Sequence, residues 1–82
     1  MTTLAVELHP YAKNIDFTQD SLVVELIDGR TISAPLVWFP RLSRANPAQL
    51  SNWELLGDGE GIHWPDLDED LSIRGLLAGT HN

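Results

Sequence analysis

His63 and the carboxylates near it are the residues of this chain best suited to chemistry. A histidine acts as a general base near neutral pH when a nucleophile or a bound water lies within hydrogen-bonding reach. His63 lies between Ile62 and Trp64, so the two-residue period of a strand turns its side chain away from both. His9 and His81 lie near the chain ends, and no serine has a nucleophile-elbow context. We interpret His63 as a structural residue bonded to backbone or to a nearby carboxylate; a small hydrolase-type enzyme is the alternative.

The acidic run after Pro65 has the spacing that begins a calcium loop. Asp66, Asp68 and Asp70 alternate, as do the first three ligands of an EF-hand, but that motif also requires glycine at position six and glutamate at position twelve. Both positions are leucine here. We therefore predict a solvated loop, in which Glu69 and Asp70 stabilise the N-terminus of a following helix.

A second group of carboxylates surrounds a glycine-rich turn. Glu54, Asp58 and Glu60 contain the pair of groups that acid–base catalysis needs, but nothing in the sequence fixes their separation. Residues 57–61 alternate glycine with acid, and they lack the lysine of a phosphate-binding loop. We predict surface carboxylates here, with no catalytic residue, no metal and no cofactor.

The elements that would position these groups begin with a β-meander. Apolar residues alternate from Ala12 to Pro35, and Asp28-Gly29 between two alternating runs predicts a hairpin with a type I′ turn. Pro35 has no amide hydrogen, so pairing should stop there. The pattern predicts three antiparallel strands near 13–18, 21–27 and 30–34.

The second part of the chain predicts short helices and another hairpin. Pro40 fits a first helical turn and Asn46-Pro47 fits an N-cap followed by N1, which favours two helices over one bent helix. Ser72 can cap a last helix that Gly79 ends. The predicted elements are helices near 40–45, 47–52 and 73–77, and strands at 53–56 and 62–64. The fold class is α+β: a small antiparallel β-meander with short helices, in two weakly related hairpin-plus-helix halves.

Length and composition indicate one compact domain. The 82 residues leave no room for a second core, and 43% apolar with 21% charged residues is typical of a folded domain. We expect an N-terminal extension over residues 1–11, where a strand over 4–8 is one possibility, and a single domain over 12–80. The absence of cysteine, of a signal peptide and of a long apolar run favours a cytoplasmic location and no membrane segment.

The net charge of -7 bears on the kind of partner. Binding to a phosphate backbone needs clustered Lys and Arg, so we expect no direct contact with nucleic acid. The charge favours a basic partner, or simply solubility. The three tryptophans should lie mostly in the core. Arg30 and Arg41 should pair with carboxylates, and they are also the best candidates for a specific partner contact.

Several motifs together resemble a known family. They are Asp28-Gly29-Arg30-Thr31-Ile32, Phe39-Pro40-Arg41-Leu42 and the run from Gly61 to Ser72, GIHWPDLDEDLS. Over residues 12–80 the chain is similar to a widespread bacterial domain-of-unknown-function family, which includes the N-terminal domain of an uncharacterised regulator-like protein from a nitrifying bacterium. The resemblance implies a small α+β fold in two related halves. Some such domains precede a helix-turn-helix domain, and others look like antitoxin or accessory proteins; no catalytic residue is implied.

These observations together favour a non-catalytic, acidic protein-interaction module. We expect it to be antitoxin-like, or accessory to a small basic partner. A stand-alone oligomerisation or ligand-sensing domain, related to the N-terminal domains of helix-turn-helix regulators, is the alternative, and a homo-oligomer is possible. The expected partner-binding residues are Arg30, Trp38, Arg41, Asp58, Glu60, His63, Asp66 and Asp68.

Overall fold

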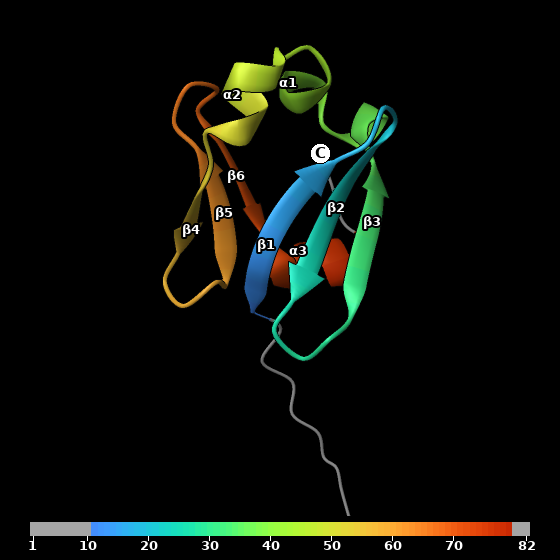
Figure 1. Ribbon diagram of the computed structural model, residues 1–82, viewed down its shortest axis with the longest axis vertical. Helices are drawn as coiled ribbons and strands as arrows, with labels where there is room; N and C mark the ends of the chain where they lie inside the picture. Colours follow the sequence, from blue (N-terminus) through green and yellow to red (C-terminus); the bar gives the residue numbers. More distant parts are fainter. Residues whose placement is uncertain (1–10, 80–82) are drawn as a thin grey trace, which may run out of the picture.

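Two antiparallel β-meanders, each followed by short helices, make up the fold (Figure 1). The computed structural model describes residues 11–79; the expected strand over 4–8 lies outside them. The first sheet has the order β1-β2-β3, formed by Ala12–Phe17, Ser21–Leu26 and Thr31–Pro35. The second has the order β4-β5-β6, formed by Glu54–Leu56, Gly61–Trp64 and Glu69–Ser72. The predicted α+β class is confirmed.

The second half is a three-stranded meander like the first, where the sequence predicted only a hairpin. The run expected to be an acidic loop contains β6, which pairs with β5 in the register Ile62↔Leu71 and His63↔Asp70. Glu69 and Asp70 therefore belong to a strand, and the first turn of the following helix contains no acidic residue. The prediction that they stabilise that helix is wrong. Pairing with β5 forms this strand, and Leu71 adds apolar contact because it turns toward the interior.

The turn between β2 and β3 differs from the predicted type. The Gly29 N–H donates to the Leu26 carbonyl (3.1 Å), and the Leu26 N–H donates to the Arg30 carbonyl (2.8 Å). Gly29 has φ +98° and Asp28 does not have positive φ. The connection is a three-residue hairpin loop, in which a type I turn is followed by a residue in the left-handed conformation at a β-bulge. The predicted type I′ turn would need positive φ at two positions. Pairing also continues to Pro35 opposite Ser21, where the missing donor lies at the end of an edge strand.

Short helices connect and close the two sheets. A 3-10 turn, Leu36–Trp38, was not predicted, and it leads into α1 at Pro40–Ser43. α2, Pro47–Ser51, begins with the expected Asn46 cap: the Gln49 N–H donates to the Asn46 side chain, and the Asn46 N–H donates in return to the Gln49 side-chain oxygen. α3, Ile73–Ala78, begins at the Ser72 cap and ends at left-handed Gly79, both as predicted. Among residues 11–79, none of the helices has the length and apolar composition of a membrane-spanning segment.

The core lies between the two sheets. β2 turns its alternate residues inward, and β5 turns Ile62 and Trp64 inward while His63 stays on the opposite face. Trp64 is fully buried, its ring edge meets Phe17 and its Nε1–H donates to the Leu50 carbonyl of α2 (3.1 Å), so its only polar atom is satisfied. The other two tryptophans pack on the core only in part. The largest fully buried side chains are Trp64, Leu22, Leu26, Leu42, Ile62, Ile73 and Val24.

Candidate functional site

The outer face of the second sheet carries a cross-strand row of three ionisable groups. Register places Glu54 of β4 opposite His63 of β5, and His63 opposite Asp70 of β6. Directly opposite residues on one face of an antiparallel pair have side chains in contact, and His63 Nδ1 hydrogen-bonds to Asp70 Oδ1. The expected bond between His63 and a nearby carboxylate is confirmed.

This row sets the electrostatics of His63. The hydrogen bond to Asp70 is the main cause that raises the pKa of His63 above its ordinary value of 6.5, against a smaller opposing effect of desolvation. The charges of Asp70, Glu54 and Asp68 act in the same direction as the hydrogen bond. Each carboxylate stabilises the imidazolium form, because opposite charges attract. Protonation of His63 therefore adds a positive charge at the centre of an acidic surface.

The connection between β5 and β6 is tied to the helices. Asn52 Nδ2 donates to Asp66 Oδ2 (3.0 Å), and Arg41 Nη1 of α1 donates to the Asp68 carbonyl (2.6 Å). Arg41 also lies 3.6 Å from a carboxylate oxygen of Glu69. Asp68 has φ +52°, a left-handed conformation that aspartate tolerates better than most residues. Arg41 thus joins two elements, and its expected pairing with a carboxylate is confirmed.

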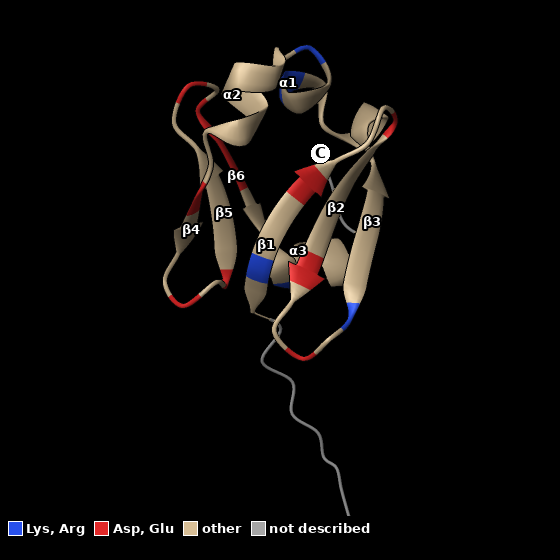
Figure 2. Ribbon diagram, in the orientation of Figure 1, with Lys and Arg blue, Asp and Glu red and all other residues tan. Residues whose placement is uncertain are grey.

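The structure divides the predicted partner-binding residues between two ends of the molecule. The helical segment with Trp38 and Arg41 lies at one end, as does the acidic β5–β6 connection, which is red in Figure 2, and Arg41 bonds to the Asp68 carbonyl there. The β2–β3 turn, which precedes Arg30, lies at the other end, as does the β4–β5 turn with Asp58 and Glu60 (Figure 1). Arg30 pairs with Asp28, its Nε and Nη2 lying 2.9 and 2.8 Å from one carboxylate oxygen. Arg30 and Arg41 therefore do not share one face.

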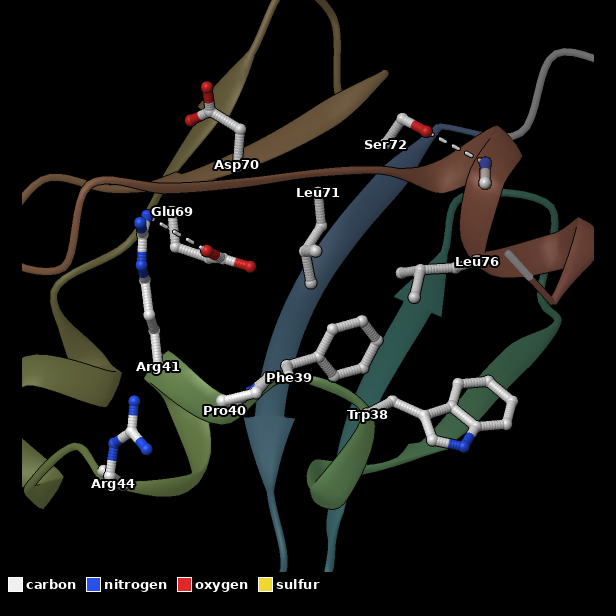
Figure 3. Close-up of a pocket in the computed structure, with 11 residues that line it drawn as sticks. Trp38, Phe39, Pro40, Arg41, Arg44, Glu69, Asp70, Leu71, Ser72 and Leu76 are labelled. Atoms are coloured by element: carbon white, nitrogen blue, oxygen red, sulfur yellow. Dashed lines mark hydrogen bonds and ion pairs between the residues drawn. The ribbon is translucent and has the colours of Figure 1, made fainter. Parts of the chain in front are cut away.

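A cleft of about 580 Å³ lies between β6 and the helical segment (Figure 3). Trp38, Phe39, Arg41 and Arg44 form one wall, and β6 with the start of α3 forms the other. Glu69 and Leu71 point into the cleft, whereas Asp70 and Ser72 point away. Sequence reasoning missed this cleft and Arg44; the available signal was two arginines three residues apart in one predicted helix, a spacing that shares a face.

Neither region has the ligand set of a metal centre. Among residues 11–79, no three His, Cys, Asp or Glu side chains converge so as to hold a metal ion. The cross-strand row has one imidazole and two carboxylates on an exposed sheet face. This arrangement can attract cations and basic side chains by charge.

The fold and this surface define a small α+β domain with an acidic sheet face and a separate cleft. Residues 12–82 match the family described as Protein of unknown function (DUF2442), and the chain belongs to that family. No curated protein matches the chain.

Two solved structures share the fold. One, a protein of unknown function from Rhodospirillum rubrum, is 37% identical, with a TM-score of 0.75 over 89% of this chain and 90% of that one. The other, an uncharacterised protein from Chromobacterium violaceum, is 24% identical, with a TM-score of 0.74 over 88% of this chain and 68% of that one. At this lower identity the likeness shows the fold alone.

Proposed function

We propose that this protein is a non-catalytic interaction module whose second sheet binds a small basic protein, in the manner of an antitoxin or an accessory subunit. One observation carries the proposal: residues 54–72 contain seven of the twelve carboxylates and neither lysine nor arginine. These carboxylates lie on β4, on β6 and in the two turns that connect β4, β5 and β6. The seven are Glu54, Asp58, Glu60, Asp66, Asp68, Glu69 and Asp70.

The sheet presents these charges on a fixed framework. Glu54 and Asp70 belong to paired strands, and Asp66 is held by Asn52. Charges fixed before binding lose less conformational freedom when a partner binds. A surface of one sign also steers an oppositely charged partner toward it and discriminates against acidic ones. The site therefore suits lysine and arginine side chains of another protein.

One observation favours the second candidate function, ligand sensing. The cleft beside β6 has a volume within the range of small-molecule sites and contains two arginines. His63 does not line it, so the cleft gives no support to the hydrolase-type alternative. Ligand sensing and protein binding use different surfaces, and variants can separate them.

An affinity capture with three forms of the protein tests the proposal. The bait variant is Glu54→Gln/Asp58→Asn/Asp66→Asn, which neutralises three carboxylates of the second sheet and its turns. The matched control is Asp16→Asn/Asp20→Asn/Glu25→Gln, which removes the same charge from the first sheet. Proteins captured from the source organism are identified by mass spectrometry, and the affinity of any recovered protein is then measured with purified components.

The expected result is a basic protein that wild type and the first-sheet control bind alike. The second-sheet variant should bind it at least about tenfold more weakly, since charged contacts at protein interfaces commonly contribute more than about 1.4 kcal/mol. Equal loss in both triple variants would mean that only net charge matters. A partner that binds all three forms equally, or no basic partner at all, would refute the proposal.

A further inference from the structure

Among the described strands, β6 has one edge that pairs with β5 and an outer edge with no partner strand. The Ile73 N–H donates to the Glu60 carbonyl (3.0 Å), and β5–β6 pairing continues from there. Hydrogen-bonded and non-bonded pairs alternate in an antiparallel ladder. The backbone N–H and C=O groups of Leu71 therefore point toward β5. Asp70 and Ser72 direct their backbone N–H groups to the other side. No further strand pairs with that edge in the described part of the chain, so β6 can accept another strand.

Arg44, which forms no salt bridge with any carboxylate of residues 11–79, lies across the cleft from this edge. Arg44 follows α1, lines the cleft wall and is exposed. No described carboxylate forms a salt bridge with it, whereas Arg41 beside it is engaged by the Asp68 carbonyl and by Glu69. At physiological salt the acidic groups on the far side of the sheet are screened over about 8 Å. Arg44 can therefore pair with a carboxylate that enters the cleft.

Between the outer edge of β6 and Arg44, the cleft is partly apolar. Leu71 points into it from β6, and Phe39 and Leu76 lie along its inner side (Figure 3). A strand added beside β6 would direct every second side chain toward these groups, because strand side chains alternate between faces. From β6 outward, the cleft thus offers backbone groups for strand pairing, then an apolar surface, and then the guanidinium of Arg44.

We propose that this cleft binds an extended peptide segment that adds to the free edge of β6 and places a carboxylate side chain against Arg44. This mode of recognition takes affinity from main-chain hydrogen bonds and specificity from alternate side chains. The carboxylate pairs with the guanidinium through charge-assisted hydrogen bonds. This site is separate from the outer sheet face proposed to bind a basic protein, so either proposal can fail alone.

Titration of the isotope-labelled protein with blocked peptides of about seven residues tests the proposal. In the probe, threonine alternates with valine, glutamate and valine, and the latter three side chains face the cleft. A small library varies the two valines among apolar residues. Two matched probes replace the glutamate by glutamine, or methylate the backbone nitrogens that would pair with β6. The readouts are the amide resonances of Asp70 and Ser72 and the affinity.

We expect these two amides to shift and to gain protection from hydrogen exchange. The glutamine probe and the variant Arg44→Ala should each weaken binding about tenfold, and N-methylation should abolish it. Arg74→Ala, which removes an exposed arginine of α3 outside the cleft, should bind like wild type. Failure of every library member at millimolar concentration, or equal binding by Arg44→Ala, would overturn the proposal. Protection that depends only on protein concentration would assign the edge to a second copy instead.

Discussion

The pairing of His63 with Asp70 makes one imidazole responsive to pH on an otherwise acidic face. The pKa of His63 is raised chiefly by the hydrogen bond to Asp70. A raised pKa in the folded state means that folding favours the protonated form. The resulting stability is fully present below the unfolded value of 6.5 and is lost as pH rises through the folded pKa.

Substitution of Asp70 should therefore remove a pH-dependent part of the stability. We expect Asp70→Asn to return the pKa of His63 toward its ordinary value, whereas Glu54→Gln should change it less, because Glu54 acts only through its charge. Wild type should lose stability relative to Asp70→Asn as the pH rises from below 6.5 through the raised pKa of folded His63. NMR titration of the imidazole and urea unfolding over a series of pH values measure these effects. A His63 titration unchanged in Asp70→Asn would contradict the assignment.

At the scale of elements, the beginning of β1 and the β4–β5 turn form a direct backbone contact between the two halves of the fold. The Ala12 N–H donates to the Gly59 carbonyl at 2.7 Å. Gly59 has φ +103°, and a Cβ added there would lie 2.5 Å from the Ala12 carbonyl oxygen. Only glycine allows the two backbones to approach this closely.

Alanine scanning of two glycines separates this close approach from backbone strain. Gly29 has a similar φ of +98°, but an added Cβ would meet no atom within 4 Å. We expect Gly29→Ala to cost about 1–2 kcal/mol, from conformation alone. Gly59→Ala should cost about 3 kcal/mol or more, because it adds a backbone clash. Urea denaturation measures both; equal losses would show that the contact between Ala12 and Gly59 contributes nothing beyond φ.

Local signals in the sequence predicted most of these elements, and the misses have physical reasons. Asn46 and Ser72 bond to amides three residues ahead, so their capping roles follow from neighbouring residues. β6 was missed because its Glu and Asp residues have low strand propensity and only its pairing with β5 makes it a strand. The cleft joins residues near 38–44 with residues near 69–76, a contact that no local pattern encodes.

For the molecule as a whole, the excess of negative charge opposes compactness. Twelve carboxylates face five lysines and arginines, and seven of the carboxylates lie within residues 54–72. Like charges held within a Debye length repel one another and destabilise the folded state. The ion pair Arg30–Asp28 is exposed and the pair Arg41–Glu69 is partly exposed; both offset this only slightly, because surface pairs contribute little.

Added salt should consequently stabilise the protein. We expect the melting temperature to rise by a few degrees between about 0.02 and 0.5 M sodium chloride, because screening weakens the repulsion. The variant Glu54→Gln/Asp58→Asn/Asp66→Asn should melt higher at low salt and respond less. Calorimetry of both forms over the salt series checks this expectation. A melting temperature that falls with salt in wild type would show that attractive pairs dominate.

The strand order has a consequence for how the chain reaches its native state. Within residues 11–79, each strand pairs only with its neighbours along the chain, so each sheet forms by closing short loops, which cost little entropy. Topologies built from such local pairings fold quickly for their size. The last strand of the first meander ends at Pro35. All three strands of the first sheet are therefore available during synthesis once residues up to Pro35 have left the ribosome. The acidic second sheet is synthesised later, and its Trp64 side chain packs against a first sheet whose strands are already available.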